Sequence, residues 1–98
     1  MRFSVPDVFR AMADPHRLRM LELLRRGPRT AGGIASHFQM TQPAVSHHLG
    51  VLRRAGCVAA EKRGKEVHYS INRCCIEECC GDLFVRIGIS NKATLKRS

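Results

Sequence analysis

Residues 41–56 read Thr-Gln-Pro-Ala-Val-Ser-His-His-Leu-Gly-Val-Leu-Arg-Arg-Ala-Gly, and this stretch decides the fold. Thr41 is a suitable N-cap, Pro43 fits the first turn because its missing N–H costs nothing there, and Gly56 can end the helix in a left-handed conformation. At about 100° per residue, the apolar side chains lie with His48 on one side of the helix: Val45, Leu49 and Leu52. The sequence therefore predicts an amphipathic helix with one packed face and one free face.

The free face of this helix combines hydrogen-bonding and cationic side chains with no carboxylate. Its members are Gln42, Ser46, His47, Arg53 and Arg54. Amides, hydroxyls and imidazoles can read base edges, and guanidinium groups can hold phosphates. We therefore interpret this helix as a DNA-recognition helix; the competing interpretation is an ordinary solvated helix face.

The charge of the chain also favours a polyanionic partner. Its 98 residues include 17 Lys plus Arg against 8 Asp plus Glu, which gives a formal net charge of +9 and an isoelectric point near 10.2. No acidic residue lies between Glu22 and Glu61. Such a concentration of positive charge favours nucleic acid, through phosphate contacts and counterion release. A membrane surface fits less well, because glycine and proline breaks leave no long basic amphipathic helix.

The length predicts one small domain, residues 1–88, followed by a basic, disordered tail, residues 89–98. No apolar run reaches the roughly 18 residues of a membrane span, and Asp7 and Arg10 interrupt the apolar positions that a signal peptide would need. We therefore expect a cytoplasmic protein, in which the five cysteines are reduced thiols.

Two helices are expected at the start of the chain. Ser4 and Asp7 resemble a capping box that begins the first, and Asp14 followed by Pro15 begins the second. The second helix is strongly apolar and should be central to the core, through Leu18, Met20, Leu21, Leu23 and Leu24. A helix-turn-helix follows, in which residues 30–38 form a short helix capped by Thr30 and residues 41–55 form the recognition helix.

The apolar period changes from 3.6 to 2 after residue 56, which predicts a β-hairpin. Residues 58–61 and 67–71 alternate between apolar and polar, and residues 62–65, Lys-Arg-Gly-Lys, form a cationic turn. A hairpin next to a recognition helix is a wing, and Arg63 and Lys65 would reach phosphates or the minor groove. The competing interpretation is a solvated turn.

Asn72 can cap a last helix whose apolar stripe is left without cover. Ile76, Cys80, Leu83 and Ile87 follow one another at steps of four, three and four residues. Because no other element remains to cover this stripe, we expect a second copy of the chain to do so. The predicted dimer interface comprises Val8, Ile76, Leu83 and Ile87.

Taken in order, five stretches of the chain resemble the ArsR/SmtB family of bacterial winged-helix repressors, and within it the short autorepressors. They are residues 9–24, 30–38, 42–49, 52–56 and 64–71, which together cover about residues 8–72. The resemblance implies a mainly α fold with a small β-hairpin: a winged helix-turn-helix of about five helices and a two-stranded wing. It also implies a homodimer that blocks transcription on an operator and is often released by a metal ion, a metalloid or a redox change.

The effector motifs of such repressors are not reproduced in this sequence. The Cys-x-Cys pair in the helix before the recognition helix has no counterpart in residues 30–38, and no histidine follows His68 to complete a C-terminal zinc set. The second helix also lacks the cysteine that persulfide-sensing members pair with one in the last helix. The cysteines of this chain must therefore be interpreted from their own chemistry.

Four cysteines gather at the start of the last predicted helix: Cys74, Cys75, Cys79 and Cys80. Cys75 and Cys79 lie on one flank and can present two thiolates together, and a third could come from Cys74, from Cys80 or from the partner subunit. Three thiolates suit arsenite or antimonite, and four suit zinc or cadmium. A thiol redox switch and inert packed cysteines are the competing interpretations. Cys57 lies alone at the start of the hairpin.

The predicted function is a DNA-binding repressor that is not an enzyme, needs no cofactor and is released by a soft metal or metalloid ion at these four cysteines. An effector-independent and a redox-switched repressor are the alternatives. The predicted DNA contacts are Thr41, Gln42, Pro43, Ser46, His47, Arg53, Arg63 and Lys65. A thiol enzyme would need a Cys-x-x-Cys pair or an activating histidine, and a module for single-stranded RNA would need stacking aromatics. The basic free face argues against a protein-binding module.

Overall fold

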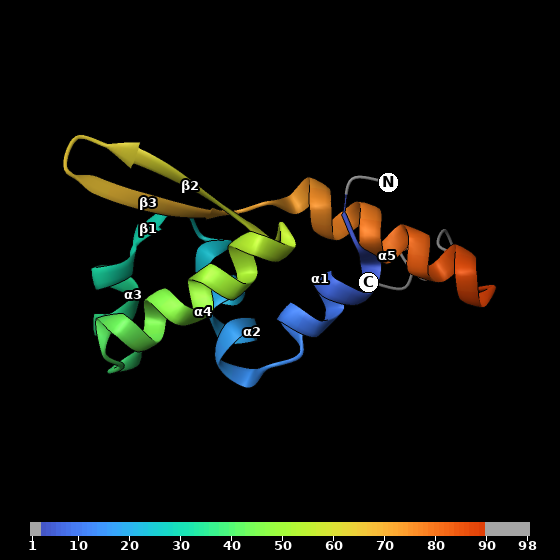
Figure 1. The fold of residues 1–98 in the computed structure, drawn as a ribbon, viewed down its shortest axis with the longest axis horizontal. Helices are drawn as coiled ribbons and strands as arrows, with labels where there is room; N and C mark the ends of the chain where they lie inside the picture. The colour runs from blue at the N-terminus through green and yellow to red at the C-terminus, as the bar shows by residue number, and fades with distance from the viewer. Residues whose placement is uncertain (1–2, 90–98) are drawn as a thin grey trace.

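The computed structural model describes residues 3–89, so the prediction of a disordered tail falls almost wholly on residues outside that range. In chain order the elements are α1 (Val5–Met12), α2 (Pro15–Leu24), β1 (Arg29–Thr30), α3 (Ala31–Phe38), α4 (Gln42–Ala55), β2 (Val58–Arg63), β3 (Glu66–Ile71) and α5 (Arg73–Ile87). This order confirms the predicted winged helix-turn-helix. The wing and α5 extend toward opposite ends of the molecule, and α4 lies between them (Figure 1).

The predicted helix starts are confirmed by side-chain caps. Five residues each accept a hydrogen bond from a backbone N–H in the first turn of the helix that follows: Ser4, Asp14, Thr30, Thr41 and Asn72. These bonds satisfy N–H groups that have no partner inside the helix. At the other end, α4 stops at Gly56, whose φ of 96° is a left-handed conformation that glycine adopts without steric cost.

The core forms where α1, α2 and α4 meet the start of α5. Its largest fully buried apolar side chains include Met20 and Leu24 from α2, Ile34 from α3, and Leu49 and Leu52 from α4. Because the whole apolar face of α4 is buried, this helix is held in a fixed orientation with its polar face outward.

Two expectations about apolar side chains are wrong. Leu18 was expected in the core but has 49% of its surface exposed, because α2 packs through the neighbouring positions Met20, Leu21, Leu23 and Leu24. Val8 was expected in the dimer interface but is 0% exposed inside a single chain. Its side chain has no surface left for a partner subunit.

The wing is a three-stranded antiparallel sheet in the order β1-β3-β2, one strand more than predicted. Strand β1 adds Arg29 and Thr30 opposite Tyr69 and His68 of β3. The strands β2 and β3 pair as far as Arg63 and Glu66, so the tip is the two-residue turn 64–65 and not the expected four-residue turn. Gly64 has a φ of 63°, a conformation that suits a tight hairpin.

Candidate nucleic-acid interface

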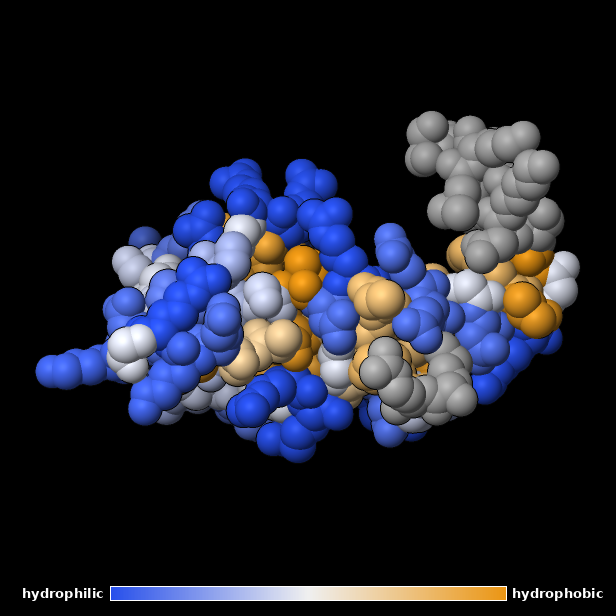
Figure 2. All heavy atoms as spheres, turned by 90° about the horizontal axis from the view of Figure 1, so that it is seen from above, coloured by the Kyte–Doolittle hydropathy of each residue, from blue (hydrophilic) through white to orange (hydrophobic). Residues whose placement is uncertain are grey.

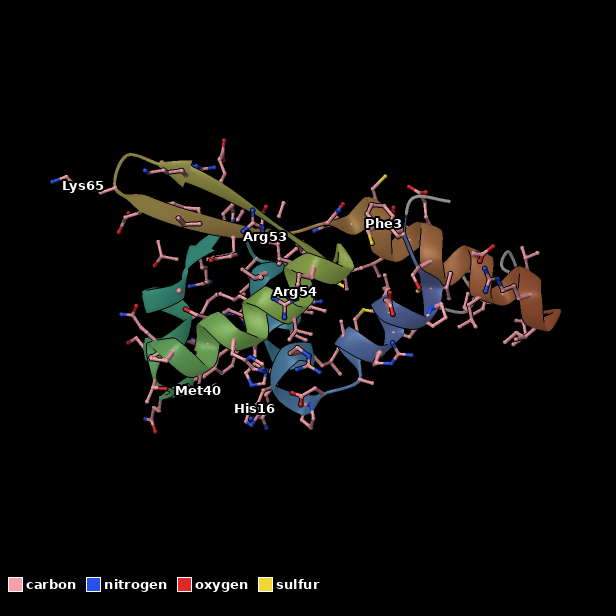
Figure 3. The ribbon with its side chains drawn as sticks, in the orientation of Figure 1. Phe3, His16, Met40, Arg53, Arg54 and Lys65 are labelled. Atoms are coloured by element: carbon pink, nitrogen blue, oxygen red, sulfur yellow. The ribbon has the colours of Figure 1, made fainter. Side chains whose placement is uncertain are left out.

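The outward face of α4 is the main feature of the candidate interface. Every residue that the sequence assigns to DNA contact is exposed: Thr41, Gln42, Pro43, Ser46, His47, Arg53, Arg63 and Lys65. The opposite face of α4 contributes Val45, Leu49 and Leu52 to the core, each with 0% exposure. Figure 3 shows Arg53 and Arg54 on the C-terminal half of α4 and Lys65 at the tip of the wing. The polar face is therefore free along the length of the helix.

A tight turn sets α4 against α3. Gln39 adopts the left-handed conformation, with φ 55°, and the backbone N–H of Met40 donates a 3.0 Å hydrogen bond to the carbonyl oxygen of Ala35. This arrangement closes the end of α3 and sends the chain into the Thr41 cap after two residues. The first turn of α4 thus emerges at the surface, where Thr41, Gln42 and Pro43 are exposed.

Arg17 of α2 links α4 to α1, a contact that sequence reasoning missed. Its Nε donates a 2.6 Å hydrogen bond to the carbonyl oxygen of Ala11, and its Nη1 lies 3.2 Å from Nδ1 of His48. Because arginine is always protonated, Nδ1 must accept this hydrogen bond, so His48 is a neutral imidazole protonated on Nε2. The two residues are 31 positions apart in the sequence, so no local sequence pattern could predict that they are in contact.

Burial is the main cause that lowers the pKa of His48 below its usual value of 6.5. The positive charge of Arg17 lowers it further, and nearby Asp14 opposes the shift. The pKa of Asp14 is itself lowered, chiefly because its carboxylate accepts a hydrogen bond from the backbone N–H of Arg17. The imidazole therefore serves as a packed, neutral support of α4 and not as a group that faces a ligand.

The wing carries its positive charge at the tip. Arg63 pairs with Glu61 at 3.1 Å, which neutralises part of its charge while leaving the guanidinium exposed. Lys62 and Lys65 have no ion pair with any residue from 3 to 89. The wing can therefore offer free ammonium groups on the side of the molecule that extends beyond α3.

The cysteines divide into a buried set and an outer set. Cys57, Cys75 and Cys79 are 0% exposed, Cys80 is half-buried and Cys74 is exposed. The sequence suggested that Cys57 is isolated from the other cysteines. In the structure it interacts with Cys79 and Cys75, where α4, β2 and α5 meet. The Cys75 thiol also points to the carbonyl oxygen of Ala55, 3.9 Å away. The buried set packs α5 against the end of α4.

Burial raises the pKa of the Cys57 thiol to about 11, with a smaller effect from Cys79. It raises the pKa of Cys75 to about 12, with additional effects from Cys79 and Cys57. Such thiols remain protonated at neutral pH, and the thiolate is the form that binds metals and reacts with oxidants. The helix therefore does not present Cys75 and Cys79 to solvent as a pair of thiolates.

The apolar stripe of α5 is split along its length. Its members Ile76 and Leu83 are half-buried against the core, whereas Ile87 is 56% exposed, and Val85 beside the stripe is 76% exposed. Figure 2 shows hydrophobic side chains at the α5 end of the molecule and mainly hydrophilic ones at the end that carries the wing. No helix among the described residues is long and apolar enough to cross a membrane.

A family model described as "Bacterial regulatory protein, arsR family" matches residues 14–60, a range that includes α2, α3, α4 and the start of β2. The transcriptional repressor SdpR of Bacillus subtilis (strain 168) is 39% identical over 72 residues, which are 74% of this chain and 80% of that protein. The matched segments include both helices of the helix-turn-helix.

Two solved structures show the same architecture. A crystal structure titled as a possible transcriptional regulator for arsenical resistance superposes with a TM-score of 0.75 at 31% identity, and covers 93% of this chain and 94% of that one. A homodimeric winged helix-turn-helix DNA-binding domain from Mycobacterium bovis superposes with a TM-score of 0.70 at 29% identity, and covers 84% of this chain and 77% of that one.

Proposed function

The chain belongs to the ArsR family of bacterial regulatory proteins, and we propose that it represses transcription by inserting the exposed face of α4 into the major groove of an operator. It is a DNA-binding transcriptional repressor, from a family of regulators and not of enzymes. The observation that carries the proposal is the division of α4 into a fully buried apolar face and an exposed polar one. A repressor of this kind acts in the cytoplasm, where the operator is.

The proposed contacts divide by chemistry. Gln42, Ser46 and His47 lie on the first half of α4 and are exposed, which supports their proposed role as the residues that read base edges. Thr41 and Pro43 lie beside them and are also exposed, so they can contact the DNA backbone next to the bases. Arg53, Arg63 and Lys65 supply cationic side chains for the phosphate backbone, which positions the protein without selecting a sequence.

We further propose that the repressor binds as a homodimer through α5. Three of the five exposed large hydrophobic residues among residues 3–89 lie at the end of this helix or just after it: Val85, Ile87 and Ile89. A second copy would remove this surface from water and place two recognition helices roughly 34 to 36 Å apart, one turn of DNA. The homodimeric relative from Mycobacterium bovis supports this assembly.

A soft-ion site built from Cys74, Cys75, Cys79 and Cys80 does not fit this conformation. Within residues 3–89 no group of three or more His, Cys, Asp or Glu side chains is arranged to hold a metal ion. The two central thiols are buried and Cys75 has a raised pKa, while Cys74 projects to the surface. The buried thiols therefore favour a repressor whose cysteines stabilise α5 and whose DNA binding does not depend on a soft ion.

Release by arsenite, antimonite, zinc or cadmium is the second candidate. The observation that favours it is the accumulation of four cysteines within seven residues of α5, more than the packing of the helix requires. One relative is named as an arsenical resistance operon repressor, from Staphylococcus xylosus. Titrating a preformed operator complex with each ion and with peroxide separates the two candidates: no dissociation favours the first, and dissociation that is lost in a Cys75→Ala variant favours the second.

The experiment that tests DNA reading starts from a random duplex library, because it yields the operator sequence directly. On the selected duplex, Ser46→Ala or Gln42→Ala should weaken binding by about 1 to 3 kcal/mol and leave random duplex almost unaffected. Arg63→Ala should weaken both equally. Selection of no preferred sequence, or equal effects of the base-reading and phosphate-binding variants, would contradict the proposal.

A further inference from the structure

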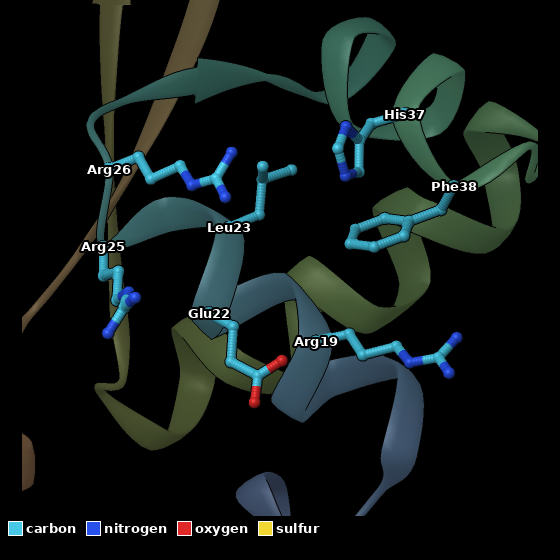
Figure 4. A pocket seen from close by; sticks show the side chains of 7 residues that line it. All are labelled: Arg19, Glu22, Leu23, Arg25, Arg26, His37 and Phe38. Carbon is cyan, nitrogen blue, oxygen red and sulfur yellow. The ribbon is translucent and has the colours of Figure 1, made fainter.

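A basic pocket lies between α2 and α3, away from the proposed DNA-binding face. It encloses about 480 Å³ and is lined by Arg19, Glu22, Leu23, Arg25, Arg26, His37 and Phe38 (Figure 4). In Figure 1 the helix α4 lies in front of α2, whereas Figure 4 looks into the pocket from a side on which α2 lies in front of α4. The pocket therefore opens on the opposite side of α2 from the recognition helix.

The charge in this pocket is not neutralised by the protein. Three arginines and a single carboxylate, that of Glu22, line it, and none of these four side chains forms an ion pair or hydrogen bond with another residue in the described part of the chain. A concave surface with unpaired guanidinium groups attracts anions.

The wall of the pocket is apolar and aromatic. Leu23 is almost fully buried at its base, and the rings of His37 and Phe38 lie edge to face, with their centroids 4.8 Å apart. In Figure 4 the side chains of Arg26, Leu23, His37 and Phe38 surround the same space, whereas the ends of Arg19 and Arg25 project away from it. One guanidinium group thus lies next to a surface that suits a flat ring.

We propose that this pocket binds a small aromatic carboxylate. The planar fork of Arg26 matches a carboxylate in bidentate geometry, and the ring of the ligand would lie between Leu23 and the edge of Phe38. The carboxylate of Glu22 repels the anionic end of the ligand and so directs it toward Arg26. The volume of the pocket is in the range of sites that hold single-ring ligands.

Three probes separate the contributions of the charge and the ring: benzoate, acetate as the anion without a ring, and benzamide as the ring without a charge. Amide chemical shifts of the ¹⁵N-labelled protein, measured without DNA, should move with benzoate at residues 19–26 and 37–38. Benzoate should bind about tenfold more tightly than either acetate or benzamide, because each of these keeps only one of the two contacts. The measurement is independent of DNA reading, so it can fail while the proposed repressor function stands.

Arg26→Gln should weaken benzoate binding about fivefold or more while the rest of the spectrum stays unchanged, which shows that the fold is retained. Arg73→Gln is the matched control, because it removes one exposed positive charge at the start of α5, outside the pocket. Equal weakening by the two variants, or benzoate shifts spread equally over α4 and the wing, would overturn the proposal. So would acetate or benzamide binding as tightly as benzoate.

Discussion

The side-chain amide of Asn72 donates a 3.0 Å hydrogen bond to the carbonyl oxygen of Gly56, which ties the start of α5 to the end of α4. The backbone N–H of Asn72 donates another, 2.8 Å long, to the carbonyl oxygen of Cys57, and its side-chain oxygen accepts the N–H of Cys75 at 3.4 Å. One residue thus joins the proposed recognition helix, the wing and the proposed dimerisation helix.

Asn72→Ala should lower the free energy of unfolding by about 1 to 2 kcal/mol, because it removes both the helix cap and the bond to Gly56. Urea denaturation followed by circular dichroism measures this loss. Asn72→Ser is the informative companion, since serine still caps a helix but is too short to replace the amide at Gly56. It should recover part of the loss. Equal stability of the alanine variant and the parent would show that this junction contributes nothing.

Gly56→Ala should destabilise the protein more than the same change at Gly64. Both glycines have positive φ, 96° and 63°, so both substitutions carry a conformational cost of about 1 kcal/mol. A Cβ at residue 56 would also lie 2.7 Å from the ring of Phe3 and 3.2 Å from the sulfur of Cys75, whereas at residue 64 it meets nothing within 4 Å. The difference between the thermal midpoints of the two variants measures the destabilisation caused by the steric clash at residue 56. Equal midpoints would show that this clash costs nothing.

The sequence predicts α4 well because its determinants are local. The cap at Thr41, the three buried apolar positions and the stop at Gly56 all lie within 16 consecutive residues, and each acts through its immediate neighbours. The same holds for the capped starts of the other helices. Strand β1 escaped prediction because two residues are too few to show alternation, and it exists only through pairing with β3.

Contacts between distant positions could not be predicted in this way. The sequence shows that α2 is rich in apolar residues, but it does not show which side of the helix faces the core. For this reason Leu18 was wrongly predicted to be buried. The approach of Cys57 to Cys79 across 22 positions depends on how α5 turns back onto the end of α4. The seven residues of the basic pocket likewise come from α2, the turn after it and α3, and the spacing of residues in the sequence does not show how these segments lie relative to one another.

Thiol labelling should distinguish the outer cysteines from the buried ones. Cys74 is exposed and should react with iodoacetamide in the native protein, whereas Cys57 and Cys75 should not, because burial raises their pKa values and blocks access. Mass spectrometry of peptides after native and denatured labelling gives the modification at each site. If Cys75 in the native protein were labelled as fast as Cys74, α5 would open readily. Cys75 would then again be a candidate ligand for a soft metal ion.

Ile87→Asp should convert the proposed dimer to a monomer without unfolding it, since Ile87 is 56% exposed in the single chain and its replacement removes no core contact. Leu83→Asp is a weaker test, because Leu83 packs partly against the core. Val67→Asp provides the control, as it places the same charge on an exposed apolar residue of the wing. Sedimentation should show a monomer for Ile87→Asp and a dimer for Val67→Asp. If Ile87→Asp also remained a dimer, the dimer interface would not include Ile87.

His48 should make the stability of the protein fall as the pH falls below about 6.5. The folded chain holds the pKa of His48 below 6.5, so in that range the unfolded chain binds the proton more readily and unfolding is favoured; above it the stabilisation is fully present. Protonation also removes the acceptor for Arg17 and adds a second positive charge beside it.

His48→Gln keeps an acceptor but cannot titrate, so its midpoint in urea should change less than that of the parent between about pH 7.5 and about pH 5.5. His37→Gln, an exposed change on α3, should leave the pH dependence of the parent intact. If the urea midpoints of His48→Gln and His37→Gln both change with pH as much as that of the parent, the inference that a neutral His48 supports α4 is wrong.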